Sequence, residues 1–194
     1  MKLNTKTSIK FSLLIMSVLM VACGGEKSNN TSEADKSSDE SKIAYSSITG
    51  TAFGFTTLNN SNVTANCKDG VGFKDEVKVD AQGKWQGQID SSKFPCRLEV
   101  KANEQSYHSY ISQAGSVNIN PLTDLTITYA SMQLPNTWYQ SGMMTEEKLK
   151  SANAALVAEL IKKEYSLDSK TDLFTTEIKT ANPLHLAIQA LFEA

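Results

Sequence analysis

The side chains most able to do chemistry are few in this sequence. His108 and His185 are the only histidines, and no His-Glu-x-x-His or Gly-x-Ser-x-Gly pattern occurs. His108 falls in a predicted strand, where the alternation puts it opposite Tyr107, and we expect it to be exposed or half-buried. His185 is expected on the polar side of the last helix or near its cap. Neither position indicates a catalytic residue or a metal ligand.

A group of acids and two tryptophans are the other candidates for a site. The acids surround one predicted turn and could hold calcium weakly, but their spacing matches no calcium loop, so a solvated acidic face is favoured. The tryptophans could stack on a sugar, although packing in the core is the favoured interpretation. The residues concerned are Asp69, Asp75, Glu76, Asp80, Trp85 and Trp138. The sequence therefore predicts no catalytic residue, no metal site and no cofactor, and it leaves any ligand site undefined.

The N-terminus predicts export and a lipid anchor. Three lysines precede an apolar run at residues 11–22, which suits a signal peptide and is short of the ~20 residues that span a bilayer. The sequence Met-Val-Ala-Cys-Gly at 20–24 resembles the bacterial lipobox, with methionine where leucine is usual. The resemblance implies cleavage before Cys23 and acylation of Cys23, which would anchor the chain stably in a membrane. The alternative is an uncleaved anchor helix with an incidental cysteine.

The residues after Cys23 predict the destination and a tether. In the sorting rule that accompanies the lipobox, aspartate beside the cysteine retains a protein in the inner membrane, so Gly24 favours the outer membrane of a Gram-negative bacterium. Residues 24–42 contain no large apolar side chain, which predicts a disordered tether. We therefore divide this part into a signal peptide at 1–22 and a lipidated cysteine with its tether at 23–45.

Charge and cysteine number narrow the possible partners. The chain of 194 residues has a net charge of -2, and removal of a signal with three lysines and no acid leaves about -5, so no basic patch points to nucleic acid. If Cys23 carries lipid, Cys67 and Cys96 remain as an even pair in an oxidising compartment and predict a disulfide. Two buried free thiols are the alternative. No Cys-x-x-Cys motif suggests metal binding.

Residues 46–120 predict a β-sandwich. Short runs with period-two alternation, separated by turn residues at roughly ten-residue spacing, indicate about seven strands. Asp80 to Gly83 is the predicted loop of a hairpin. Both Cys67 and Cys96 take inward-facing positions, as a bridge across the core would require.

Residues 121–194 predict a helical subdomain, which makes the fold class α+β. Asn120-Pro121 begins a helix with Leu122, Leu125 and Tyr129 on one face. Residues 133–142 are expected to form a loop. Thr145 caps the clearest helix, which extends to about residue 164, and Asn182-Pro183 begins the last one. Between them, residues 168–180 are ambiguous, and their apolar anchors are Leu173, Phe174 and Ile178.

Three segments together resemble a family of proteobacterial exported proteins, mostly uncharacterised lipoproteins. These segments are Ile-Thr-Gly-Thr-Ala at 48–52, the two cysteine segments at 63–67 and 94–98, and Val-Asn-Ile-Asn-Pro-Leu-Thr-Asp-Leu at 117–125. In that family a carboxypeptidase-regulatory-like (transthyretin-like) sandwich precedes a helix that begins with Pro-Leu-Thr-Asp/Glu-Leu. The resemblance implies a fold and a location, and it brings no catalytic residues.

These patterns favour a lipid-anchored, non-enzymatic interaction or structural module of the cell envelope. Its partners would be the membrane, through Cys23, and an unidentified envelope protein. The alternatives are a protein that binds a small ligand such as a carbohydrate, or an inhibitor or accessory subunit of an envelope enzyme. A polar pocket between sandwich and helices would favour the former, and an exposed apolar patch the latter.

Overall fold

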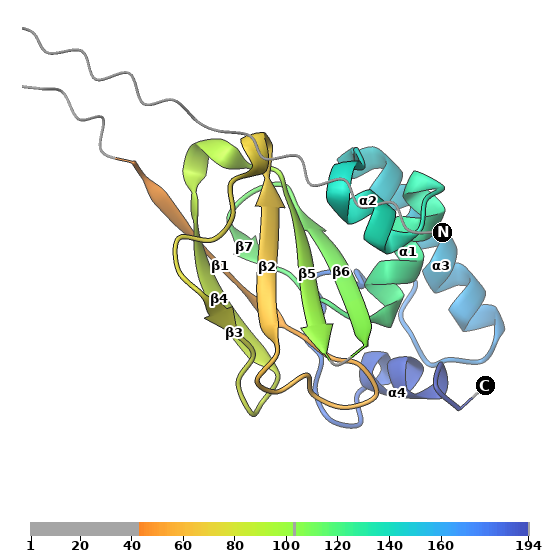
Figure 1. Ribbon diagram of the computed structural model, residues 1–194. Coiled ribbons are helices and arrows are strands. Elements are labelled where there is room, and N and C mark those ends of the chain that lie inside the picture. Colours follow the sequence, from red (N-terminus) through yellow and green to blue (C-terminus); the bar gives the residue numbers. More distant parts are fainter. Residues whose placement is uncertain (1–42, 103, 194) are drawn as a thin grey trace, which may run out of the picture. The chain divides into compact units, whose positions relative to one another are not determined.

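Two β-sheets followed by helices make up the fold in the computed structural model, which describes residues 43–102 and 104–193 (Figure 1). The predicted signal peptide and Cys23 lie outside the described residues. The strands are β1 (Tyr45–Thr51), β2 (Asn62–Cys67), β3 (Val77–Lys78), β4 (Lys84–Asp90), β5 (Cys96–Ala102), β6 (Gln105–Ile111) and β7 (Gly115–Ser116). The helices are α1 (Pro121–Ser131), α2 (Pro135–Ser141), α3 (Glu146–Lys162) and α4 (Pro183–Ala190). The predicted α+β class is confirmed.

The strands form a three-stranded sheet, β4-β1-β7, and a four-stranded sheet, β3-β2-β5-β6. All pairs are antiparallel except β1 with β7, which are parallel. The predicted turn is present, because Asp80 Oδ1 accepts the backbone N–H groups of Gln82 and Lys84, and Gly83 takes φ +77°. It does not close a hairpin within one sheet, however. It carries the chain from β3 in the larger sheet to β4 in the smaller one.

The core lies between the two sheets because strands such as β2, β4 and β5 alternate apolar and polar residues. In β4 the burial strictly alternates, so that Trp85, Gly87 and Ile89 face inward. On β1, Gly50 pairs with Trp85, and a Cβ at Gly50 would collide with the Trp85 indole and with the Val117 carbonyl oxygen. Glycine at position 50 therefore leaves room for the Trp85 indole and lets the chain at Val117 approach β1.

Cys67 and Cys96 are joined by a disulfide, as predicted. The bridge differs from the expected one because the two residues are direct partners in the antiparallel pair of β2 and β5. Both cysteines face the core, with exposed fractions of 4% and 1%. The disulfide therefore links neighbouring strands of one sheet and does not connect the two sheets across the core.

Helices cover the β5-β6 part of the outer face of the four-stranded sheet, whereas Asn62 and Thr64 on β2 stay exposed. Registration of β2, β5 and β6 aligns two rows of polar residues on this face. Their members are Thr64, Glu99 and His108 in one row and Asn66, Arg97 and Tyr110 in the other. Helix α2 packs over them, since Tyr139 Oη lies 2.9 Å from Thr64 Oγ1 and Arg97 donates to the Gly142 carbonyl at 2.9 Å. Helices therefore form a third layer (Figure 1).

Helix α1 begins as predicted but buries a different face. The Asn120 side chain caps it by accepting the N–H groups of Leu122 and Thr123. Its buried residues are Leu122, Thr123, Thr126 and Ile127. The three apolar residues predicted on one face differ in burial: Leu122 is buried, whereas Leu125 and Tyr129 are 44% and 64% exposed.

The rest of the helical part follows the sequence pattern with one correction. Residues 135–141 form helix α2, where a loop was expected, and its Trp138 and Tyr139 are buried. Thr145 caps α3 and Asn182 caps α4, as predicted. The anchors Leu173, Phe174 and Ile178 are buried, although residues 168–180 contain no regular helix. No helix within 43–102 or 104–193 has both the length and the apolar character to cross a bilayer.

Candidate functional site

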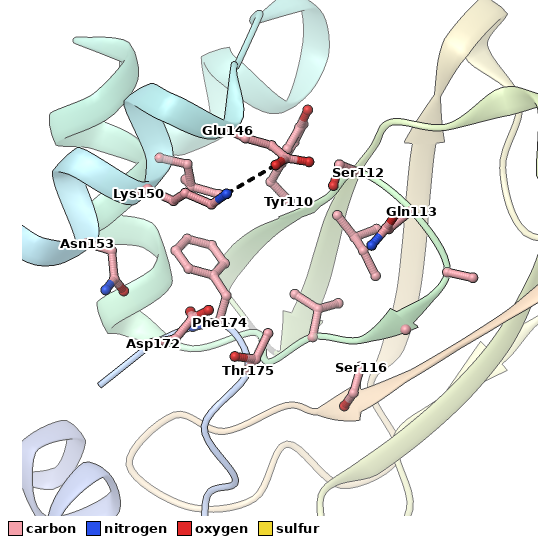
Figure 2. A pocket seen from close by; sticks show the side chains of 15 residues that line it. Tyr110, Ser112, Gln113, Ser116, Glu146, Lys150, Asn153, Asp172, Phe174 and Thr175 are labelled. Atoms are coloured by element: carbon pink, nitrogen blue, oxygen red, sulfur yellow. Dashed lines mark hydrogen bonds and ion pairs between the residues drawn. The ribbon is translucent and has the colours of Figure 1, made fainter. Parts of the chain in front are cut away.

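A pocket of about 540 Å³ opens between the sandwich and the helices (Figure 2). Three segments that are distant in sequence build it. The end of β6 and the following chain through Val117 form one wall, and the first half of α3 forms the second. Residues 172–175 form the third. No property of the sequence brings these three segments together before the chain folds, so sequence reasoning did not identify this site.

Asparagine side chains fix the third wall of the pocket. The Asn153 amide donates to the Thr171 carbonyl and accepts the Leu173 N–H, both at 2.9 Å. From the sheet side, Asn118 donates from its side chain to the Thr176 carbonyl at 2.6 Å, and its backbone N–H donates to the Phe174 carbonyl. These bonds replace the backbone pairing that an irregular segment lacks, so the pocket wall is held from both sides.

The mouth of the pocket carries an ion pair and several neutral polar groups. Glu146 and Lys150, one turn apart on α3, approach to 3.4 Å. A hydrogen bond from Ser112, followed in size by one from Lys150, lowers the pKa of the Glu146 carboxyl. The neutral polar residues along the walls are Tyr110, Ser112, Gln113, Ser116, Asn153 and Thr175.

The apolar lining comes from the strand end and from the helix. Ile111, Val117, Leu149 and Phe174 line the pocket beside the Tyr110 ring. Burial raises the pKa of the Tyr110 hydroxyl, so this phenol stays protonated at neutral pH. A pocket with apolar surface and hydroxyl, amide and carboxylate groups suits a polar organic molecule that offers both donors and acceptors.

His108 lies outside the pocket, at the centre of a buried cluster of titratable groups. The expectation of an exposed or half-buried histidine is wrong, since His108 is 0% exposed. Its Nδ1 lies 3.1 Å from Asp124 Oδ1, and its backbone N–H donates to the same oxygen at 2.6 Å. On the other side of the ring, Nε2 faces Glu99 Oε1 at 3.4 Å. The Tyr139 ring covers the imidazole with a centroid distance of 5.5 Å.

This cluster has the components of catalytic chemistry but the geometry of a structural contact. A histidine oriented by a carboxylate is half of a hydrolytic triad, which further needs Nε2 to face a nucleophile. Here Nε2 faces a second buried carboxylate, and Glu99 is 5% exposed. Burial raises the pKa of Asp124, and hydrogen bonding to His108 lowers it part of the way back. The cluster therefore joins β5, β6 and α1 and leaves no room for a substrate.

The other sequence candidates take structural positions. His185 lies near the α4 cap, as expected, but it is buried rather than polar-facing, and its Nδ1 accepts the Ala181 N–H at 3.2 Å. Trp85 and Trp138 are core residues with exposed fractions of 3% and 0%, which leaves no face for a sugar. Asp69 pairs with Lys93 at 2.8 Å.

The acidic group is spread over the surface rather than focused on one point. Asp80 holds its own turn, Glu76 lies 3.4 Å from Lys78, and Asp75 is exposed. Within the described residues, no set of three histidine, cysteine or acidic side chains could hold a metal ion.

Comparison with known proteins finds distant structural similarity alone. No family model matches the chain, and no curated protein matches it. Among solved structures, a DUF3823 family protein from Parabacteroides merdae ATCC 43184 is similar at 15% identity, with a TM-score of 0.29. The match covers 39% of this chain and 45% of that one, so it spans less than half of the neighbour. We base neither fold nor function on a similarity at this level.

Proposed function

We propose that this protein is a lipid-anchored cell-envelope protein whose folded part is a non-enzymatic binding module. The N-terminal sequence supports the anchor through its lysine-rich start, its short apolar run and its lipobox-like residues at Cys23. The Cys67–Cys96 disulfide supports export, since disulfides persist in oxidising compartments. The outer membrane remains the favoured destination because Gly24 follows the cysteine.

The pocket in Figure 2 is the observation that carries the binding role. It lies between sandwich and helices, and its walls are held by side-chain hydrogen bonds. Serines line the pocket but neither histidine does, so its lining lacks the histidine base that activates a serine or cysteine nucleophile in acyl transfer. These features support a binding role, and the lipoprotein resemblance brings no catalytic residues.

The lining favours a neutral sugar as the ligand class. Hydroxyl groups of a sugar can donate to the carboxylates of Glu146 and Asp172 and pair with the amide of Gln113. The two carboxylates and the single ammonium of Lys150 give the lining a slight negative charge, which disfavours phosphorylated or carboxylated ligands.

Cys23→Ser is expected to abolish incorporation of labelled palmitate and to move the protein from the detergent phase to the aqueous phase. The reason is that only the thiol of Cys23 can carry the diacylglycerol that the lipobox resemblance implies. Met20→Leu, which restores the usual lipobox residue, is the matched control and should keep the label. Undiminished labelling of Cys23→Ser would refute the anchor.

Ligand-observed NMR with glucose and N-acetylglucosamine tests the pocket. We expect saturable binding with a Kd on the order of 1 mM, equivalent to about -4 kcal/mol, which is reasonable for an open pocket. Ser116→Trp should abolish it by filling the pocket, whereas Ser47→Trp, on the exposed face of β1, should not. Binding that survives Ser116→Trp would place the ligand elsewhere.

A further inference from the structure

Helix α1 presents a row of apolar side chains that nothing in the described chain covers. Leu125, Tyr129 and Met132 recur at helical spacing, and Leu134 follows them; their exposed fractions are 44%, 64%, 85% and 72%. We call these four residues the apolar stripe. Single exposed apolar residues are common on soluble proteins, but four within ten residues on one surface mark an interaction face.

The apolar stripe borders a groove between α1 and α3. The groove measures about 880 Å³, and α3 contributes Ala155, Leu156 and Ala158 to it. Its lining contains one charged residue, Glu159, which is paired with Lys162 at 2.6 Å. A partner that depends on phosphate or carboxylate recognition would need cations here, so the chemistry of the groove selects an apolar partner.

The described chain begins at the end of the sandwich where the stripe ends. The first strand pairs Tyr45 with Asp90, and the Ser91 N–H donates to the Ala44 carbonyl, immediately before β5 starts at Cys96. At that same end, Arg97 holds α2 through its Gly142 carbonyl, and α2 begins just after Leu134. In Figure 1 the start of β1 and helix α2 both lie at the upper end of the sandwich.

The length of chain before β1 keeps this end of the molecule near a membrane. Residues 24–42 lie between Cys23 and the described chain. At no more than about 3.3–3.6 Å per residue, 19 residues span at most about 65 Å. A face tethered within that distance meets the bilayer at a high effective concentration, so even a weak apolar contact would be populated.

We infer that the apolar stripe docks on the lipid bilayer into which Cys23 is anchored. This inference rests on the proposed lipid anchor. Met132 and Leu134 enter the acyl boundary, and Tyr129 places its ring at the interface with its hydroxyl in water. Because the groove has no unpaired cation in its lining, docking requires no anionic lipid.

Photolabelling in vesicles tests this face. The acylated protein, purified from cells, is reconstituted in phosphatidylcholine vesicles that contain a lipid with a diazirine in its acyl chain. We expect the peptide with residues 125–134 to be labelled at least fivefold more than those with Phe55 and Leu186, which are also exposed. Met132→Ser/Leu134→Ser should remove this preference, and the matched Phe55→Ser/Leu186→Ser variant should keep it.

The outcomes separate docking from anchoring. The mass of the Cys23 peptide reports acylation independently of the label. An acylated chain without preferential labelling at 125–134 overturns the docking face. If the Cys23 peptide is unmodified, the proposed lipid anchor is refuted. Docking is then tested alone with a chain that begins at Gly24 and is attached to nickel-chelating lipid by an N-terminal histidine tag. That chain contains the compact unit Ser41–Ala194 and its disulfide; labelling at 125–134 then supports the face and its absence overturns it.

Discussion

Replacing Cys67 and Cys96 together with alanine is expected to lower the free energy of unfolding by about 3–4 kcal/mol. The bridge closes a loop with a sequence separation of 29, and on the chain-entropy model this restriction of the unfolded chain is the source of the stabilisation. Because the closed loop includes β3 and β4, which belong to different sheets, the unfolded chain keeps parts of both sheets close together. Urea unfolding monitored by tryptophan fluorescence measures the effect.

Reduction provides the control for the disulfide prediction. A thiol reductant should destabilise the natural protein by a similar amount and leave the double alanine variant unchanged. A loss below about 1 kcal/mol in both experiments would show that pairing of β2 with β5 is strong enough without the covalent link.

Asp124→Ala is expected to destabilise the protein by about 3 kcal/mol. The carboxylate accepts two bonds from His108, one from the backbone and one from the ring, and both donors would remain buried without a partner. An unsatisfied buried donor costs about 1–3 kcal/mol. Asp124→Asn retains an acceptor oxygen and should lose about 1 kcal/mol. Equal losses in the two variants would show that charge, rather than hydrogen bonding, matters at this position.

The contribution of Asp124 to the free energy of unfolding should depend on pH, and the sign of this dependence follows from its pKa. Burial raises the pKa of Asp124 above its ordinary value of 3.8, so the folded state binds this proton more tightly than the unfolded state. The contribution of Asp124 to stability is therefore fully present below pH 3.8 and declines as the pH rises through the folded-state pKa. The stability of the natural protein relative to Asp124→Asn should fall with rising pH in this window. A difference that is constant with pH would contradict the raised pKa.

The sequence predicted the strands well because one face of each strand contacts the core. The period-two pattern located β2, β4 and β5 and the inward position of both cysteines. It could not predict which strands pair, so the disulfide was expected across the core rather than between Cys67 and its neighbour Cys96 in one sheet.

The helices packed on the sheet account for most of the differences between the predicted and the observed burial of side chains. Glu99 and His108 alternate with core residues as solvent-facing residues would, and they are buried because helices α1 and α2 pack over them. On α1, Leu125 and Tyr129 have the spacing of a core face, while threonines take that role through bonds such as that from Thr123 Oγ1 to the His108 carbonyl. The pocket residues come from three separate segments spread over residues 110–175, and periodicity carries no information on contacts between them.

Side chains of helix α1 bond to the free edge of strand β6. Strand β6 ends its sheet, and Asp124 and Thr123 bond to the N–H and C=O groups of His108 that an adjacent strand would otherwise use. Asp124 thus provides the acceptor, and Thr123 the donor, that one residue of an adjacent strand would provide. A fragment cut after Asn120 would leave this edge open to recruit β6 of another molecule, so strand exchange and aggregation between sandwiches are what the helices prevent.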